Sequence, residues 1–481
     1  CAFQRYDVYR NRSFIYVSGI DKLNKQSTCL QIPRKDEPSA VLELQEGEQR
    51  FPLTHLEPHQ QKLRGPQHQV EEVATKASGL VGFIRFTSGF YLILIKKHKK
   101  VGRIGYHNIL SIESTILVPL SADASKEEKG FMDQFNKFNL CKDFYFSYSY
   151  ELSRTMQQNL ADAKRASHGQ ALRPLYLEKD TSKHHRFVWN HFHMTPFLQK
   201  EGWQHWCLPI IHGFFAQTRC SSFGWSFSVA LIARRSRFYA GTRYRKRGLN
   251  VDGQVGNDVE TEQLLCDEST RHLACGHVMS FVQIRGSVPL FWSQEAAAYN
   301  PKPPVVYPRC DPTLSATRRH FADLLERYGT PQLVVNLMKA KKVDSYEVRL
   351  SKHFESAIER MNRELPPEHR ILYRPFDMKN HAKSNSAIFE VFSRLAESAV
   401  SRVGFFHTKM GLQGMPEKLQ TGVVRTNCVD CLDRTNVLQF FVGLEVLKQQ
   451  LTAMSWLPEP KMDFECQAVL VLSELYDVMG D

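Results

Sequence analysis

A stretch of twelve residues, RTNCVDCLDRTN at 425–436, gathers two cysteines, two aspartates and two arginines. Five residues separate Cys428 from Arg434, and none of the other ten of the eleven cysteines has an arginine six positions later. A loop of this length can curl around one phosphoryl group, so that backbone N–H groups and the guanidinium bind its oxygens. The sulfur then lies behind the phosphorus, which suits a covalent phosphocysteine intermediate.

The segments around this loop favour a reactive thiol. We expect a short strand at 420–424 and a long amphipathic helix at 436–454, with the loop between them. The N-terminus of a helix attracts anions and lowers the pKa of a nearby thiol from about 8.5 to roughly 3.5–7.5. In such a position Cys428 is a thiolate and therefore a nucleophile.

Other interpretations of Cys428 and Cys431 leave more of the neighbouring residues unexplained. Cys428 and Cys431 form a C-x2-C pair, but a structural zinc site needs a second pair, and the sequence offers none. A thioredoxin-like redox site fits the helix N-terminus and leaves Arg434, Asp430 and Asp433 without a role. A plain buried thiol does not gather so many charged neighbours.

The first part of the chain reads as β-structure. LVGFIRFTSGFYLILI (80–95) contains two apolar runs separated by turn residues, which predicts a hairpin. KKHKK (96–100) follows, and we interpret it as a solvated turn or, alternatively, as a patch that faces an anion. FYFSYSYELS (144–153) alternates aromatic residues with serine and predicts a half-buried strand before a helical pattern begins.

The second part alternates strands with helices, which predicts an α/β fold with a parallel or mixed sheet covered by helices. A boundary near 186–192 divides the chain into modules at 1–190 and 191–481. The expected strands are 226–236, 331–338, 370–377 and 420–424, and the expected helices are 317–329, 346–365, 386–403 and 436–454.

The amino-acid composition restricts the kinds of molecule that the chain can bind. The 481 residues include 63 Lys and Arg against 50 Asp and Glu, so the formal net charge of +13 favours an anionic partner. No apolar run is long enough for a membrane span. Eleven scattered cysteines indicate a reducing compartment. Because the chain begins without Met, we expect that it is an excised fragment.

The twelve-residue stretch resembles the signature of the Sac-domain phosphoinositide phosphatases. RKRGLNVDGQVGNDVETEQ (245–263) and VQIRGSVPLFWSQ (282–294) are similar to two further hallmarks of that family. PPEHRILYRPFDM (366–378) and FYAGTRY (238–244) resemble its Fig-four branch. The resemblance implies a β-rich N-terminal Sac module at 1–190 and an α/β catalytic module at 191–481 with a truncated C-terminal end.

This resemblance also implies an activity. It makes Cys428 the nucleophile and Arg434 the phosphate clamp, with Asp430 and Asp433 as candidates for acid–base work and no metal or other cofactor. The backbone N–H groups of the loop then bind phosphate, with Val429, Cys431, Leu432 and Thr435 as the phosphate-binding residues.

The implied reaction removes the 5-phosphate of phosphatidylinositol 3,5-bisphosphate and leaves the 3-phosphate. The implied partners are a phosphoinositide membrane surface, the phosphatidylinositol 3-phosphate 5-kinase and a Vac-type scaffold, with no nucleic acid. The implied place is the cytosolic face of late endosomal, lysosomal or vacuolar membranes. A Sac phosphatase that acts on the 4-phosphate or 3-phosphate, and a scaffold of the kinase complex, are the alternatives.

Three further segments keep two interpretations each. RKRG (245–248) is either a basic hairpin tip or a membrane-facing patch. ETEQ (260–263) is either the first turn of a helix with stabilising carboxylates or a support for the catalytic loop. Asp377, after a predicted strand, is either a helix N-cap or an acid delivered to the site.

Overall fold

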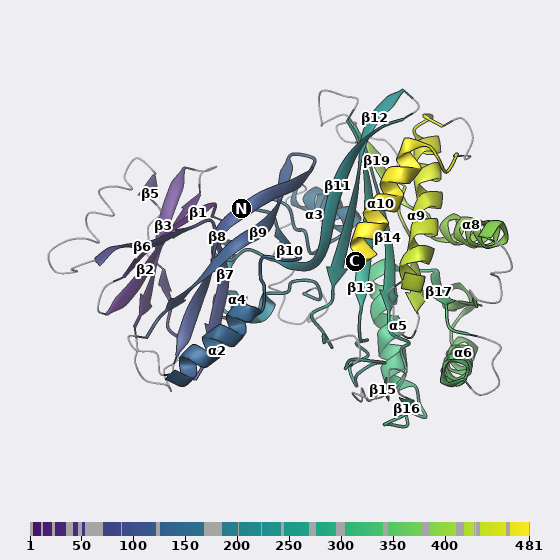
Figure 1. Cartoon of the computed structure of the whole chain (residues 1–481), viewed down its shortest axis with the longest axis horizontal. Coiled ribbons are helices and arrows are strands. Elements are labelled where there is room, and N and C mark those ends of the chain that lie inside the picture. Colours follow the sequence, from purple (N-terminus) through teal and green to yellow (C-terminus); the bar gives the residue numbers. More distant parts are fainter. Residues whose placement is uncertain are drawn as a thin grey trace. The chain divides into compact units, whose positions relative to one another are not determined.

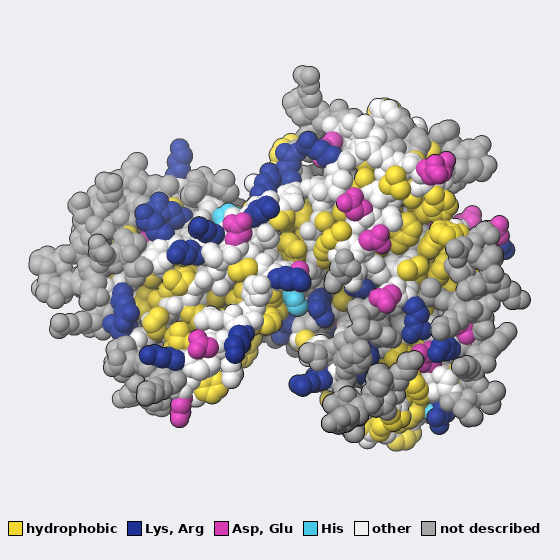
Figure 2. Space-filling model, viewed as in Figure 1, with side chains coloured by type: hydrophobic (Ala, Val, Ile, Leu, Met, Phe, Trp, Pro, Cys, Tyr) yellow, Lys and Arg dark blue, Asp and Glu magenta, His cyan; other side chains and the backbone are white. Residues whose placement is uncertain are grey.

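The computed structural model describes residues 3–10, 13–21, 25–34, 42–46, 51–52, 71–87, 89–121, 126–167, 185–200, 202–222, 224–241, 245–268, 276–294, 304–339, 345–377, 385–409, 418–427, 429, 433–457 and 462–480. Among these residues, no helix is both long and apolar enough to cross a membrane. On the face drawn in Figure 2, Lys and Arg side chains are more widespread than Asp and Glu side chains, in keeping with the net charge of +13.

The chain forms two compact units. Unit 1 comprises Cys1–Ser153 and Leu172–Gly213, and unit 2 comprises Arg154–Ala171 and Phe214–Asp481. The boundary that we expected at 190/191 lies inside unit 1. The reason is packing, because Met194, Phe197 and Trp206 are buried in the same hydrophobic cluster as the strands of unit 1.

Unit 1 consists mainly of antiparallel strands. One sheet has the order β4-β3-β2-β1-β6, with β5 paired to β3, and the strands from β7 to β10 pair in sequence order. The elements are β1 (Arg5–Arg10), β2 (Phe14–Asp21), β3 (Gln26–Pro33), β4 (Gln45–Glu46), β5 (Phe51–Pro52), β6 (Glu71–Ala77), β7 (Gly79–Arg85), β8 (Phe90–Ile104), β9 (His107–Pro119), α2 (Lys126–Lys137), β10 (Phe144–Phe146), α4 (His191–Leu198) and η3 (Trp203–Trp206).

The predicted hairpin of unit 1 is confirmed as β7 and β8. The turn predicted at 96–100 is wrong, because β8 continues through these residues to Ile104. Register shifts beside Lys97 and after Lys100 interrupt the in–out alternation, so a strand can carry several consecutive polar side chains there. The strand predicted at 144–153 is shorter than expected and ends at Phe146.

Unit 2 contains a mixed sheet with helices on both faces, and the predicted α/β fold class is confirmed. The strand order is β18-β17-β20-β14-β13-β12, in which β18, β17, β20 and β14 run parallel and β14, β13 and β12 run antiparallel. The strands are β11 (Ile211–Ser222, which starts in unit 1), β12 (Trp225–Arg235), β13 (Val259–Asp267), β14 (His277–Gly286), β15 (Ser293–Gln294), β16 (Val305–Val306), β17 (Gln332–Asn336), β18 (Leu372–Pro375), β19 (Phe406–Lys409) and β20 (Val423–Asn427).

The helices of unit 2 cover this sheet. They are α3 (Met156–Ser167), α5 (Ser315–Tyr328), α6 (Tyr346–Glu364), α8 (Asn385–Val403), α9 (Asp433–Ala453) and α10 (Gln467–Gly480), with the 3-10 turn η4 at Pro367–His369. Figure 1 shows α9 and α10 beside strands β12 to β14. The four predicted helices are therefore confirmed as α5, α6, α8 and α9.

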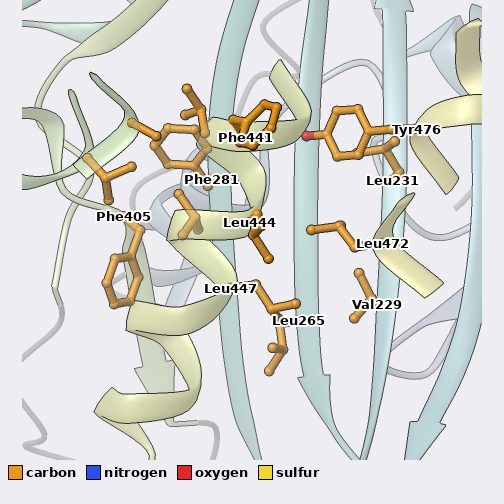
Figure 3. Packing of buried hydrophobic residues seen from close by; sticks show 14 of the residues in the cluster. Val229, Leu231, Leu265, Phe281, Phe405, Phe441, Leu444, Leu447, Leu472 and Tyr476 are labelled. Carbon is orange, nitrogen blue, oxygen red and sulfur yellow. The ribbon is translucent and has the colours of Figure 1, made fainter. Parts of the chain in front are cut away.

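Alternating side chains of the central strands fill two cores. Leu333 and Val335 of β17 pack in the cluster beneath α8, α9 and α10, whereas Val334 points into the cluster formed with α5 and α6. Figure 3 shows the first cluster, where Leu444 and Leu447 of α9 lie among side chains of the sheet and of α10. A strand that is apolar on both faces is expected in a parallel sheet that helices cover on both sides.

The ETEQ segment belongs to a strand, so its interpretation as the first turn of a helix is wrong. Residues 260–263 lie in β13, and all four side chains are buried. The carboxylates have partners that the sequence does not reveal: Glu260 and Glu262 both bind the guanidinium of Arg234 on β12.

Candidate active site

Four parallel strands end at one edge of the sheet of unit 2. The register pairs Gly286 of β14 with Asn427 of β20, Asn427 with Asn336 of β17, and Asn336 with Pro375 of β18. The segments that follow these four strands therefore leave the sheet at the same edge. In open α/β sheets this edge is where ligands bind.

The predicted catalytic loop lies between β20 and α9, as the sequence predicts. Cys428, Asp430, Cys431 and Leu432 lie outside the described residues. The other four predicted site residues are described: Val429 and Thr435 are buried, Arg434 is partly exposed and Asp433 is exposed in the first turn of α9.

Arg434 reaches the segment that follows β17. Its Nη1 donates a hydrogen bond to the carbonyl oxygen of Leu337 at 3.2 Å and lies 3.7 Å from Oε2 of Glu347 in the first turn of α6. The Glu347 side chain is 10% exposed and that of Arg434 is 30% exposed. Two neighbouring elements thus contact the guanidinium, and part of the Arg434 side chain is exposed.

Arg247 contacts the backbone of the loop at Val429. It is buried, and its Nη1 donates a hydrogen bond to the carbonyl oxygen of Val429. The next residue, Gly248, has φ +64°, and its N–H donates to Oγ of Ser287 at 2.8 Å. The RKRG segment is therefore not a solvated hairpin tip as a whole, since Arg247 and Gly248 are buried beside the loop while Arg245 is exposed.

Arg425, the first residue of the twelve-residue stretch, is 1% exposed and ties three segments together. Its Nε donates to Nε2 of His320 at 3.0 Å, and its Nη2 donates to the carbonyl oxygen of Ser287 at 2.7 Å. Because Nε2 of His320 accepts a hydrogen bond, its Nδ1 carries the proton and donates to the carbonyl oxygen of Gly253 at 3.0 Å. This arginine fixes the end of β20 next to Cys428 and has a structural role.

The asparagines at the strand ends form a second network. Asn427 Nδ2 donates to Oδ1 of Asn336 at 2.6 Å, and Asn336 Nδ2 lies 2.8 Å from Oγ of Ser351 and 2.8 Å from the hydroxyl of Tyr373. Burial raises the pKa of Tyr373, so its hydroxyl stays protonated at neutral pH. These bonds hold the ends of β20 and β17 in register under the loop.

Asp377 lies two residues beyond the end of β18, at the same edge as the loop, and is buried. This position is compatible with its interpretation as an acid of the site. The residues that would show whether it caps a helix lie outside the described residues.

Sequence reasoning missed several residues that support this site. Arg247 belongs to the RKRG segment, but nothing in the sequence around it predicts its contact with Val429. His320 and Glu347 lie on helices where a polar residue among charged neighbours looks ordinary. Only the tertiary contacts identify them.

Comparison with known proteins gives a consistent result. Residues 78–383 match the family model of the SacI homology domain. The chain is 39% identical over 420 residues to a polyphosphoinositide phosphatase of Schizosaccharomyces pombe, with 85% of this chain and 49% of that protein covered.

Plant relatives match over a longer stretch. The chain is 31% identical over 551 aligned residues to phosphatidylinositol-3-phosphatase SAC1 of Arabidopsis thaliana, with 100% and 59% covered. It is 33% identical over 529 aligned residues to phosphoinositide phosphatase SAC5 of the same plant, with 99% and 64% covered. The chain thus spans about half to two thirds of the length of these relatives.

Proposed function

The chain belongs to the SacI homology domain family, and from that premise we propose that it hydrolyses phosphoinositides through a phosphocysteine intermediate. One observation carries this proposal: the only C-x5-R spacing of the sequence begins directly after the parallel strand β20 and ends in the first turn of α9. The carboxyl end of the strand provides the ligand edge, and the first turn of the helix supplies N–H groups for an anion.

The reaction has two steps. The thiolate of Cys428 attacks the phosphorus as the bond to the inositol oxygen breaks, and a protonated carboxyl gives its proton to that oxygen. Water then attacks the phosphocysteine, returns a proton to the carboxylate and releases inorganic phosphate and the thiolate. Arg434 and the N–H groups of Val429, Cys431, Leu432 and Thr435 bind the phosphoryl oxygens, whose charge they stabilise in the transition state.

The general acid is Asp430 in this proposal, with Asp433 as the second candidate. Asp433 lies in the first turn of α9, next to Arg434, and its side chain is exposed. Its position directly before Arg434 suits a role in orienting the guanidinium better than a role as acid. Asp377 is the candidate outside the loop.

For the substrate, we favour removal of the 5-phosphate of phosphatidylinositol 3,5-bisphosphate, which gives phosphatidylinositol 3-phosphate. The identity to a relative named polyphosphoinositide phosphatase supports this choice. The chain would act on the cytosolic face of late endosomal, lysosomal or vacuolar membranes, together with the phosphatidylinositol 3-phosphate 5-kinase and a Vac-type scaffold. A second candidate is hydrolysis of phosphatidylinositol 3-phosphate or 4-phosphate, and the relative named phosphatidylinositol-3-phosphatase supports the first of these two substrates.

The test is phosphate release by the full chain from liposomes that each contain one phosphoinositide, with Cys428→Ser as the control. We expect faster release from the 3,5-bisphosphate than from the 4-phosphate and no release by the serine variant. The opposite order would assign the chain to the second candidate substrate. Release by a folded Cys428→Ser variant at the normal rate would contradict the phosphocysteine mechanism, and no release by the intact chain would favour the scaffold role.

A further inference from the structure

The half of the β8–β9 hairpin beyond Ile95 exposes four lysines. Lys96, Lys97, Lys99 and Lys100 are all exposed, and only His98 between them points inward, where its ring packs edge-on against Phe146 and Tyr148. We refer to residues 96–106 as the lysine hairpin. Sequence analysis left an anion-facing patch at 96–100 as an alternative, and the proposed catalysis does not use it.

Irregularities in the pairing bring these lysines to the surface. Lys97 pairs with Ser114 and His98 with Ile112, and further register shifts lie between Ile95 and Lys97 and between Lys100 and Gly102. In an undisturbed strand, alternate side chains point to opposite faces, so adjacent lysines would not both reach solvent on a half-buried sheet. Bulges place neighbouring side chains on one side and remove this restriction.

The lysine hairpin is also an edge of the sheet. Pairing of β8 with β7 ends at Ile95, and from Lys96 on, the described residues give β8 one partner, β9. Within the described part of the chain, no carboxylate lies within 4.0 Å of any of the four ammonium groups. The nearest acidic residue along the paired strand is Glu113, which stands at a register shift and is itself exposed.

An aromatic residue stands at the tip of this basic segment. Tyr106 follows Gly105, whose φ of +56° forms the turn, and the Tyr106 side chain is 65% exposed. Lysines alone are common on edge strands, where they prevent pairing with another sheet. That explanation does not account for an exposed tyrosine at the tip, whereas tyrosine and lysine together are typical of side chains at the bilayer interface.

We propose that the lysine hairpin docks the chain onto an anionic lipid bilayer, with the four lysines near the headgroups and Tyr106 at the interface. The proposal rests on the proposed function, because a phosphoinositide substrate lies in such a surface. Charge complementarity selects this occupant, because the segment exposes four lysines and an exposed tyrosine follows at its tip. Each lysine near an anionic surface contributes about fivefold in membrane affinity.

The experiment measures co-sedimentation of the full chain with vesicles of phosphatidylcholine, with and without phosphatidylserine and always without phosphoinositide. The test variant replaces Lys96, Lys97, Lys99 and Lys100 by Gln. The control variant makes the same change of charge at Lys76, Lys129, Lys137 and Lys142, which are exposed elsewhere in unit 1. Circular dichroism and thermal unfolding establish that both variants are folded.

We expect the test variant to lose at least about 25-fold in affinity for the phosphatidylserine vesicles, which corresponds to two lysines at the surface. The control should lose less than about fivefold. Tyr106→Ser should weaken binding further without a change in salt dependence, because it removes an apolar contact. An equal loss in both quadruple variants would reduce the effect to net charge and overturn the proposal, as would unchanged binding of the test variant.

A soluble short-chain phosphoinositide separates this proposal from the proposed function. The test variant should hydrolyse it at the rate of the unmodified chain, since none of the changed residues belongs to the catalytic loop. Vesicle binding that depends on the four lysines, in a chain that hydrolyses no phosphoinositide, would support the docking surface and contradict the phosphatase. Strong binding of the lysine hairpin to acidic peptides but not to vesicles would contradict the lipid partner.

Discussion

Three arginines around the catalytic loop illustrate how residues of one type acquire different roles. Arg247 and Arg425 are buried, and their guanidinium groups donate hydrogen bonds to backbone carbonyls and to a histidine. Arg434 alone of these three has a partly exposed side chain, and its guanidinium contacts Leu337 and Glu347. Exposure therefore separates the arginine that we propose to bind substrate from the two buried arginines near it.

The first prediction concerns Arg434. Arg434→Lys keeps the charge but loses the planar fork that binds two phosphoryl oxygens, so we expect kcat on a soluble phosphoinositide to fall about 100-fold or more. Arg402→Lys, an exposed position on α8, is the matched control and should leave kcat unchanged. Equal kcat values for the two variants would show that Arg434 does not grip the phosphoryl group.

The second prediction concerns His320, which we regard as a positioning residue. His320→Ala removes the acceptor of Arg425 Nε and the donor to Gly253, so two buried polar groups lose their hydrogen bonds. We expect the free energy of unfolding in urea to fall by about 2–4 kcal/mol. His353→Ala, exposed on α6, should cost less than about 0.5 kcal/mol. Similar losses for both variants would mean that the Arg425–His320–Gly253 chain stabilises little.

At the residue scale, spacing within the sequence is enough to propose Cys428 and Arg434, because the chemistry proposed for the loop depends on residues close in sequence. It could not predict Glu347 or His320. Glu347 touches Arg434 across 87 positions of the chain and His320 touches Arg425 across 105. Such contacts exist only once the strand order is fixed.

At the scale of elements, the pair β12–β13 shows why local pattern can mislead. Arg234 stands directly opposite Glu260 in the register. Glu262 lies two residues further along β13, on the same face of the sheet. Burial raises the pKa of Glu260, and the Arg234 charge and the Tyr328 hydroxyl oppose that shift. The polar residues of ETEQ suggested the first turn of a helix or a support for the catalytic loop, but both carboxylates pair with Arg234 inside the sheet.

The third prediction follows from this pair. Arg234→Met leaves Glu260 and Glu262 without their cation, so we expect a loss of about 3–5 kcal/mol in the free energy of unfolding at neutral pH. Arg235→Met, at the exposed neighbouring position, should cost less than about 0.5 kcal/mol.

The pH dependence of Arg234→Met gives a second readout. A carboxyl whose pKa is higher in the folded than in the unfolded chain binds its proton more tightly when folded, so stability falls as pH rises between the two pKa values. Loss of Arg234 raises the folded pKa of Glu260 further, since that charge lowers it. The deficit of Arg234→Met should therefore shrink as the pH is lowered towards the unfolded value. A deficit independent of pH would contradict the assignment to buried carboxylates.

Other elements were predictable to different degrees. The helices α5, α6, α8 and α9 follow from apolar spacing and from stop signals such as Gly329 after α5. The extension of β8 through KKHKK was not predictable, because the register shifts that expose adjacent lysines depend on pairing with β9. A run of charged residues is therefore interpreted as a turn unless the strand that pairs with it is known.

At the scale of the whole molecule, each unit has its own hydrophobic cores. One cluster of unit 1 contains Leu94 and Trp206, and one cluster of unit 2 contains Leu447. The α/β character of unit 2 followed from alternation of strands and helices. The sequence did not predict that α3 belongs to unit 2, because only tertiary contacts show this. The N–H of Met156 donates to Glu262, and the N–H of Gln420 donates to the Gln157 side chain.

The separation of the cores leads to the last prediction, which compares Leu94→Ala with Leu447→Ala. Both leucines are completely buried, so each truncation should cost about 2–5 kcal/mol through lost transfer free energy and a residual cavity. Because Leu94 and Leu447 belong to different hydrophobic clusters, we expect hydrogen exchange to accelerate in unit 1 for Leu94→Ala and in unit 2 for Leu447→Ala. In the double variant each unit should exchange as in the corresponding single variant, since sites without shared partners act additively. Faster exchange throughout unit 2 in Leu94→Ala would instead mean that the units open as one cooperative structure, and a lesion in unit 1 would then also loosen the edge of the sheet that carries Cys428.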